Sequence, residues 1–422
     1  MCEAQTRDRV EVRRPGWLLV LLGAVTGIGP FSMDMYLPAL PRISDEFHTG
    51  AAQIQLTLTA CLVGLAAGQL LVGPLSDRWG RRRPLLAGLG LYVVTSLLCV
   101  AATSPATLTL ARLGQGLAGG AAVVIARAVV RDLHSGAAAA AYFSRLVLVF
   151  GVAPVIAPSV GGIALRATGW RGIFLILAAI GLLVLVAAAT GLPETLSVAR
   201  RQAGGLAETG RGVRALLRDR SYVGYACALG LAGAGLFAYI SGSSFALQRV
   251  YGASPQVYGL LFGVNALGFV LVGQLNGHLV RRVPPRRLLA TGLVVLVAAA
   301  LALLLVTRWH SLFAVAVPLF VFMSVLGMVL PNTTALALDL HPGLAGTASA
   351  LLGAAQSLCG AVSAPLVGLG GGATPMALAM TAGAAGGMAA FLLAARGPRG
   401  DRGPRGDVHE DVAERGVRGG TS

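Results

Sequence analysis

Long apolar segments alternate with short, arginine-rich segments along most of this chain. Each apolar segment has about 20 residues or more, which lets an α-helix rising about 1.5 Å per residue cross the roughly 30 Å of a bilayer's hydrocarbon core. Strands of a membrane barrel are only about ten residues long and alternate polar with apolar positions, so these continuous runs favour helices. The pattern predicts an all-α integral membrane protein with twelve transmembrane helices. They are expected over residues 16–40, 52–76, 84–104, 106–130, 139–165, 170–192, 221–247, 256–280, 287–307, 311–338, 343–370 and 373–395.

The composition supports the same fold class. The chain has 422 residues, of which 55% are hydrophobic and only 12% charged, whereas a soluble domain has about 25% charged residues. So few charges cannot cover the surface of a water-soluble protein of this length. The lipid bilayer is therefore the expected partner of most of the surface.

The basic residues say which side of the membrane each segment faces. All 33 are arginine and the formal net charge is +16, so the chain has neither the lysine of a Walker-type ATPase nor one for a Schiff base. Such a basic chain could bind nucleic acid, or its arginines could follow the positive-inside bias. With the N-terminus placed inside, 25 arginines fall in inner segments, five in outer segments and three (Arg112, Arg127, Arg145) within spans. This distribution favours the bias, gives no reason to expect nucleic acid, and predicts a cytoplasmic-membrane protein with both termini in the cytoplasm.

The longest internal polar segment, residues 193–220, predicts a cytoplasmic linker between two six-helix halves, residues 16–192 and 221–395. Cytoplasmic tails are expected at residues 1–15 and 396–422. The second tail repeats Gly, Pro, Arg and Asp with almost no apolar residue, which predicts disorder.

An internal repeat relates the two halves. Shifting the chain by 200 residues aligns the end of the second predicted helix with the end of the eighth. Two halves repeated in the same direction, with a substrate path between them, occur in secondary transporters. The first set of matched residues is Gly68, Leu71, Val72, Gly73, Leu75, Arg81, Arg82 and Pro84, and the second is Gly268, Leu271, Val272, Gly273, Leu275, Arg281, Arg282 and Pro284.

Cysteine and histidine do not indicate a metal centre. The five cysteines have no CxxC spacing, and the six histidines are scattered singly. The sequence has no spaced metal ligands and no nucleophile–base arrangement, so nothing in it suggests an enzyme. We therefore expect no metal and no cofactor.

Three motifs carry a family resemblance. Residues 73–83 (GPLSDRWGRRR) resemble the helix 2–3 loop signature of the major facilitator superfamily, and residues 112–116 (RLGQG) resemble the helix 4 signature of its drug:proton antiporters. Pro154 and Pro158, followed by Gly161 and Gly162, are similar to the helix 5 antiporter signature, except that Ala157 stands where that signature usually has glycine. The resemblance implies two pseudo-symmetric halves of six helices.

Four further segments resemble the bicyclomycin/chloramphenicol-resistance branch: residues 33–41 (MDMYLPALP), 125–132 (IARAVVRD), 239–243 (YISGS) and 346–351 (GTASAL). The resemblance covers nearly the whole chain apart from the two tails. It implies a monomeric exporter that uses the proton gradient and binds a small-molecule substrate and protons.

Asp34 is the only acidic residue inside a predicted span. A carboxylate in hydrocarbon is costly and suggests a functional site. Asp34 and Arg112 each lie about six residues, or roughly 9 Å, from the outer end of their helices. We expect them to pair and to carry proton coupling, although a static ion pair that joins two helices is an alternative.

Asp77 ends the second predicted helix among arginines, which suggests a cytoplasmic clasp, with Arg131 as one candidate partner, that opens during transport. Ordinary surface charge balance is the alternative. Prolines and glycines in helix 5 suggest a helix that bends and packs closely, whether moving or permanently bent. The predicted gating residues are Asp77, Arg78, Gly80, Arg81, Arg127, Arg131, Pro154, Pro158, Gly161 and Gly162.

A few polar and aromatic side chains lie within otherwise apolar spans, as expected for a pocket that binds amphipathic molecules. Hydrogen bonds between helices are the alternative role. The predicted substrate-binding residues are Tyr36, Gln115, Tyr239, Ser241, Phe262, Asn265 and Asn332.

These observations favour a proton-coupled antiporter that exports small hydrophobic or amphipathic antimicrobials of the chloramphenicol or bicyclomycin kind. An exporter or importer of an endogenous metabolite with the same fold is the main alternative. A channel is disfavoured by the paired halves and by Asp34.

Overall fold

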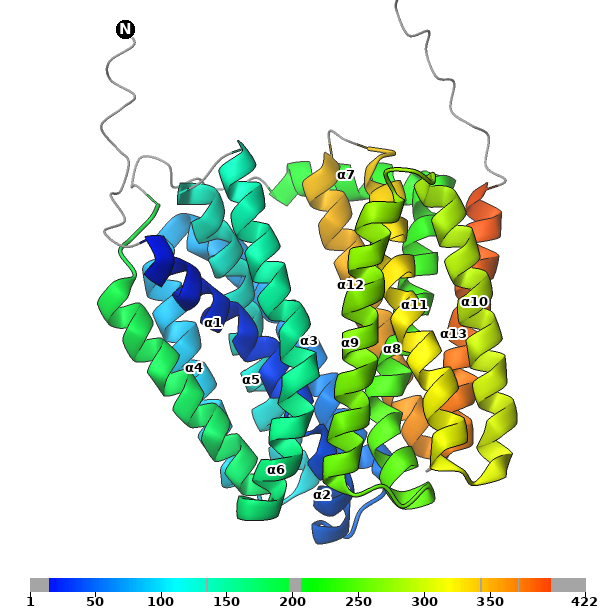
Figure 1. The fold of residues 1–422 in the computed structure, drawn as a ribbon. Helices are drawn as coiled ribbons and strands as arrows, with labels where there is room; N and C mark the ends of the chain where they lie inside the picture. Colours follow the sequence, from blue (N-terminus) through cyan, green and yellow to red (C-terminus); the bar gives the residue numbers. More distant parts are fainter. Residues whose placement is uncertain (1–14, 134–135, 197–205, 342–343, 371, 396–422) are drawn as a thin grey trace, which may run out of the picture.

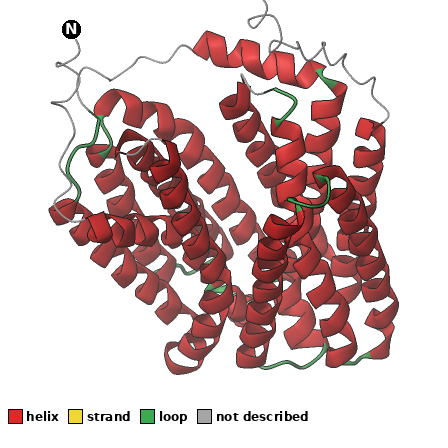
Figure 2. Ribbon diagram, turned by 45° about the horizontal axis from the view of Figure 1, so that its top comes forward, coloured by secondary structure: helices red, strands yellow, loops and turns green. Residues whose placement is uncertain are grey.

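The computed structural model describes residues 15–133, 136–196, 206–341, 344–370 and 372–395. The two tails, including the segment predicted to be disordered, and part of the predicted linker lie outside these ranges. Figure 2 shows helices joined by short loops, and the described residues contain no strand.

Eleven helices of the described chain are long and apolar enough to cross a membrane. One helix, α6, has 56 residues and holds two crossings, because Gly169 interrupts it with φ 72° and ψ −178°. At about 1.5 Å per residue, 56 residues would extend far beyond one bilayer, and Figure 1 shows the two arms of α6 running in opposite directions. The predicted all-α membrane fold is confirmed, and the spans agree with twelve crossings.

The first half contains the crossing helices α1, α3, α4, α5 and the two arms of α6. The segment after α1 consists of two short helices, η1 and α2, at the face where the chain turns. The bounds are α1 (Pro15–Asp34), η1 (Leu37–Ala39), α2 (Leu40–Glu46), α3 (Ala51–Trp79), α4 (Arg82–Val100), α5 (Pro105–Leu133) and α6 (Gly136–Gly191).

The second half contains the other six crossing helices, and α7 lies across one face of the molecule before it (Figure 1). A π-helical turn, η3, ends the first crossing helix of this half. The bounds are α7 (Leu206–Arg218), α8 (Arg220–Phe245), η3 (Ala246–Val250), α9 (Pro255–Leu279), α10 (Pro285–Val306), η4 (Thr307–Trp309), α11 (Leu312–Leu338), α12 (Ala345–Leu369) and α13 (Ala373–Ala395).

The internal repeat corresponds to a repeated helix contact. A Cβ atom on Gly68 would lie 2.1 Å from the Leu117 carbonyl oxygen, where α3 packs on α5. A Cβ atom on Gly268 would lie 2.2 Å from the Ser324 hydroxyl, where α9 packs on α11. Both glycines therefore let two helices of their own half approach closely.

The two ends of the bundle differ. We call the end with α7 and the loops at Arg78–Arg83 and Arg281–Arg287 the basic face, and the opposite end the outer face. Hydrogen bonds across the halves lie toward the outer face, for example from the Gln55 amide to the Ser241 carbonyl (3.0 Å) and from the Thr59 hydroxyl to the Ala361 carbonyl (3.2 Å). Figure 1 shows the two halves diverging toward the basic face.

Candidate functional site

The first crossing helix is interrupted in the membrane. We expected one helix over residues 16–40, but α1 ends at Asp34. Pro38 and Pro41 have no backbone N–H, so the Asp34 and Leu37 carbonyls lose the donors that a continuous helix would supply four residues later. The interruption leaves main-chain carbonyls for other elements to bind, and it puts Asp34 at the end of a helix.

Arg112 on α5 is completely buried and binds the end of α1. Its guanidinium donates to the Ser32 carbonyl (2.9 Å) and to the Gln115 side-chain oxygen (2.5 Å). It also lies 4.3 Å from the centre of the Tyr36 ring, a cation–π distance. The Gln115 amide donates in turn to the Ser96 hydroxyl (2.8 Å). The predicted residues Arg112, Gln115 and Tyr36 therefore form one network.

The expected ion pair between Asp34 and Arg112 is not formed. Within the described residues, no cationic atom lies within 4.0 Å of the Asp34 carboxylate, because Arg112 directs its hydrogen bonds to Ser32 and Gln115. Asp34 is still close enough to interact electrostatically with Arg112, and also with Tyr239 and Tyr258 of the other half. The carboxylate is 6% exposed. The carboxylate therefore interacts with a cation of its own half and with two phenols of the other.

Tyr239, Phe262 and Asn265 come together as one buried group. The Asn265 amide donates to the Tyr239 hydroxyl (2.9 Å), and the Tyr239 and Phe262 rings stack with centroids 5.2 Å apart. Tyr258 lies beside Phe262, and its hydroxyl is 3.3 Å from that of Ser243. These residues belong to α8 and α9, so the second half contributes a polar aromatic group next to Asp34.

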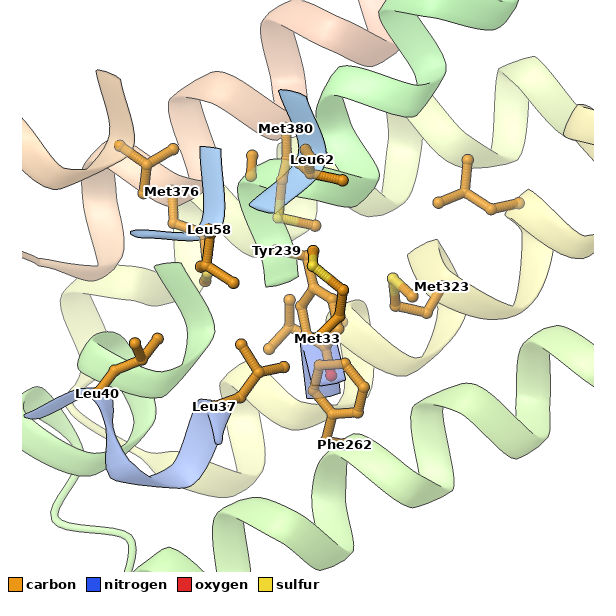
Figure 3. Close-up of a cluster of buried hydrophobic side chains, with 14 of the residues drawn as sticks. Met33, Leu37, Leu40, Leu58, Leu62, Tyr239, Phe262, Met323, Met376 and Met380 are labelled. Atoms are coloured by element: carbon orange, nitrogen blue, oxygen red, sulfur yellow. The ribbon is translucent and has the colours of Figure 1, made fainter. Parts of the chain in front are cut away.

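Apolar side chains from both halves surround this group. Figure 3 shows Met33 beside Tyr239 and Phe262, with leucines of the first half nearby. Methionine is flexible and polarisable and fits ligands of varied shape. Met33 and Leu37 lie within the motif at residues 33–41 but were not predicted to bind substrate, and the other positions belong to no motif, because an apolar residue in an apolar span carries no signal of its own. The additional residues are Met33, Leu37, Leu58, Leu62, Met323, Met376 and Met380.

Two predicted substrate residues, Ser241 and Asn332, join neither the Arg112 network nor the Tyr239–Phe262 group. The Ser241 hydroxyl bonds its own helix at the Ala238 carbonyl (3.4 Å). Asn332 donates to the side-chain oxygen of Asn276 (2.6 Å), and Asn276 is eleven residues, or about 16 Å of helix, beyond Asn265. In this structure both residues make hydrogen bonds between or within helices.

The prolines and glycines of α6 lie where α6 meets α1 and α9. A Cβ atom on Gly161 would lie 1.8 Å from the Met35 carbonyl oxygen, and one on Gly162 would lie 2.8 Å from the Pro255 carbonyl oxygen. A Cβ atom on Gly259 would in turn meet the Pro158 carbonyl oxygen at 2.7 Å. Pro154 lies one turn earlier, also inside α6. The glycines therefore bring α6 against the interruption of α1 and against the other half.

Near the basic face, Arg81 has the central position that we considered for Arg131. It donates to Asp77 (2.6 Å) and to Asp132 (2.8 Å), and its side chain is only 7% exposed. The Glu194 carboxylate accepts the backbone N–H of Arg81 (2.8 Å). Asp77 therefore pairs with Arg81, not with Arg131, and it is Asp132, the residue after Arg131, that reaches this cluster. Asp77, Arg81 and Asp132, which form its ion pairs, all belong to the first half.

Arg78, Arg127 and Arg131 are exposed, and in the described part of the chain they form no ion pair. The side chain of Arg145 lies outside the described residues. No three His, Cys, Asp or Glu side chains gather as a metal site would require, as far as the chain is described.

The fold and the site define a membrane transporter of two helical halves with a buried charge between them. Residues 22–364 match the Major Facilitator Superfamily, and the chain belongs to that family. The resemblance inferred from the motifs is confirmed.

Two relatives and one solved structure agree with this assignment. The chain is 39% identical to the Bacillus subtilis (strain 168) protein named uncharacterized MFS-type transporter YdgK, over 83% of this chain and 88% of that protein. It is 30% identical to the bicyclomycin resistance protein homolog of Haemophilus influenzae, over 83% and 88% of the two chains. A bacterial homolog of the human lysosomal transporter Spinster, in an inward-facing and occupied conformation, has the same fold with a TM-score of 0.73 and 16% identity, over 90% of this chain and 97% of that one.

Proposed function

We propose that this transporter exports small hydrophobic or amphipathic antimicrobials, of the chloramphenicol or bicyclomycin kind, in exchange for protons. Asp34 takes and releases the proton. The substrate binds between Asp34 and the Tyr239–Phe262 group. The two halves rock about this site so that it opens to one side of the membrane at a time.

The position of Asp34 carries the proposal. Its carboxylate is buried, lacks an ion pair among the described residues, and interacts electrostatically with Arg112 of its own half and with Tyr239 and Tyr258 of the other. A buried charge held this way is expensive unless it is neutralised during the cycle. The aromatic and methionine lining suits ligands with large apolar surfaces and few polar groups (Figure 3).

The proton gradient is a sufficient energy source. Moving one proton inward across 100 mV releases about 2.3 kcal/mol, before any pH difference is added. Because about 1.4 kcal/mol corresponds to a tenfold ratio, this supports roughly fifty-fold accumulation of a neutral substrate.

The arginine bias supports an orientation with the basic face in the cytoplasm. In that orientation the structure is closed to the outside and diverges toward the cytoplasm, which is the arrangement from which an exporter binds its substrate.

The test is Asp34→Asn in proteoliposomes with an imposed pH gradient and radiolabelled chloramphenicol. We expect gradient-driven uptake to fall at least tenfold, because the amide cannot carry a proton, while exchange of labelled for unlabelled drug continues. Asp339→Asn, an exposed acid at the end of α11, is the matched control and should transport normally. Proton-driven uptake at the full rate in Asp34→Asn would contradict the assignment.

Resistance to a panel of drugs, measured in an efflux-deficient host, distinguishes drug export from transport of an endogenous metabolite. Export of antimicrobials predicts raised resistance to at least one amphipathic drug, lost in Asp34→Asn. No change for any drug, with the protein present in the membrane, would instead favour an endogenous metabolite. A flux that does not depend on pH would indicate a channel.

A further inference from the structure

The segment after Asp34 is bound by the second half through its main chain. Pro41 deprives the Leu37 carbonyl of its helical donor four residues later. The Ser244 hydroxyl on α8 donates to this carbonyl at 2.5 Å, and Ser244 is completely buried. The Gln248 amide in η3 donates to the Pro38 carbonyl at 3.1 Å and to the Ser244 hydroxyl oxygen at 2.9 Å. We call Ser244 and Gln248 the outer clasp.

The π-helical turn η3 extends this contact along the segment. Its Arg249 donates to the Pro41 carbonyl (3.1 Å) and pairs with Asp45. Single π-helical turns occur often at functional sites. The Arg249–Asp45 pair is largely exposed and contributes little by itself, so the outer clasp, with one buried and one partly buried bond to the segment, holds it.

The first half holds the same segment from the other side. Arg112 donates to the Ser32 carbonyl, and Gly161 of α6 packs against the Met35 carbonyl. Along the chain Asp34 lies between these two contacts, and the outer clasp binds the residues that follow them. The chain from Ser32 to Pro38 is therefore bound by both halves at once.

This geometry has a mechanical consequence. The outer clasp joins α8 to the end of α1, which belongs to the other half, so its hydrogen bonds cannot persist when the outer face opens. Opening then releases one side of the segment that carries Asp34, while Arg112 keeps the other side. The surroundings of the carboxylate change with the state of the outer face.

We propose that Ser244 and Gln248 are positioning residues that couple closure of the outer face to Asp34. The inference deepens the proposed function, since it rests on Asp34 as the proton site for its role in transport. The energetic coupling between the outer clasp and Asp34 does not depend on which substrate is transported.

The test is a double-mutant cycle in which the distance between two spin labels is measured. Spin labels at His48 and Trp309, both exposed on the outer face in different halves, report the ratio of outer-closed to outer-open molecules in lipid nanodiscs, with the native cysteines replaced. The ratio is measured in the parent chain, Asp34→Asn, Ser244→Ala/Gln248→Met and the combined variant. Loss of the two hydrogen bonds to the segment, one buried and one partly buried, should shift the ratio at least tenfold toward open.

Coupling predicts that Asp34→Asn changes the ratio in the parent chain but has little further effect once the outer clasp is removed. Effects that simply multiply, or no effect of Asp34→Asn on the ratio, would overturn the proposal. Gln256→Met is the matched control, since it removes another hydrogen bond between the halves, to the Gly162 carbonyl (3.0 Å), in which no atom of the segment takes part. Its effect on the ratio should multiply with that of Asp34→Asn.

Transport measurements distinguish the proton-site proposal for Asp34 from the positioning proposal for the outer clasp. The outer-clasp variant should shift the pH midpoint of gradient-driven uptake by at least half a unit, and Gln256→Met should not. If Asp34→Asn transports normally while the cycle shows coupling, the proton assignment fails and the positioning role remains. If the double substitution does not fold, Gln248→Met alone replaces it in the same cycle.

Discussion

Arg112 is the most completely buried charge of the described chain and is held by a carbonyl, an amide oxygen and an aromatic ring. Its Nε atom has no hydrogen-bond partner, and leaving a buried donor unpaired costs about 1–3 kcal/mol. If Arg112 had only a structural role, an apolar side chain at this position would avoid that cost. We propose that the charge instead acts through its electrostatic interaction with Asp34.

Asp219 illustrates a charged residue with a structural role at the basic face. Its carboxylate accepts the N–H of Ser221 (2.8 Å) as the cap of α8 and pairs with His341 (2.8 Å). Burial alone would raise the pKa of Asp219, but the bonds to His341 and to the backbone N–H groups of Ser221 and Tyr222 outweigh it and lower the pKa.

A lowered pKa in the folded protein means that the unfolded chain binds the proton more tightly, so Asp219 stabilises the fold above its unfolded pKa of 3.8. This contribution is lost as the pH falls through the lower, folded value. We expect Asp219→Ala to reduce stability by about 1 kcal/mol at neutral pH, and Asp219→Asn to cost less because asparagine also caps helices. Thermal unfolding in detergent measures this. A difference between wild type and Asp219→Ala that grew as the pH fell below 3.8 would contradict the assignment.

At the scale of elements, helix ends and interruptions carry the site. α1 stops at Asp34 because of prolines, α6 reverses at Gly169, and α3 ends at Gly80 with φ 87° and ψ 171°. The prolines and glycines were visible in the sequence, but the sequence does not say whether a proline bends a helix or ends it. That outcome depends on which neighbours bind the freed carbonyls.

Gly80 offers the sharpest prediction at this scale. Its backbone conformation is nearly restricted to glycine, and a Cβ atom there would lie 2.4 Å from the Glu194 carboxylate. Gly80→Ala should therefore lower stability by about 1–3 kcal/mol and reduce transport. Gly90→Ala, within α4 and with no atom within 4 Å of the added Cβ, is the control and should be neutral or slightly stabilising. Equal unfolding temperatures for the two variants would count against this role of Gly80.

At the scale of the whole molecule, the two halves meet at the outer face and diverge toward the basic face (Figure 1). The Asp77–Arg81–Asp132 cluster lies within the first half and is intact in this arrangement. The opening of this cluster during transport, which the motif suggests, stays a prediction.

The orientation in the membrane can be tested directly. Single cysteines at Trp309 and at Arg281, both exposed and on opposite faces, should differ in labelling by a membrane-impermeant maleimide applied to intact cells. Because 25 of 33 arginines lie in the segments predicted to be inside, we expect labelling at position 309 and protection at 281 until the cells are broken. The reverse pattern would invert the proposed direction of opening.

The sequence by itself determined the membrane class, the approximate spans, the arginine bias, the repeat and the family, since hydropathy and motif spacing are local properties of the chain. It also identified Asp34, Arg112, Tyr239 and Asn265 as polar groups in apolar spans. Only the tertiary structure decided their partners: Arg112 binds Ser32 instead of Asp34, and Arg81 replaces Arg131 beside Asp77. Successive helical residues point about 100° apart, so a contact depends on how helices are rotated against each other. That rotation is set by packing of the whole bundle and is not encoded in any single segment.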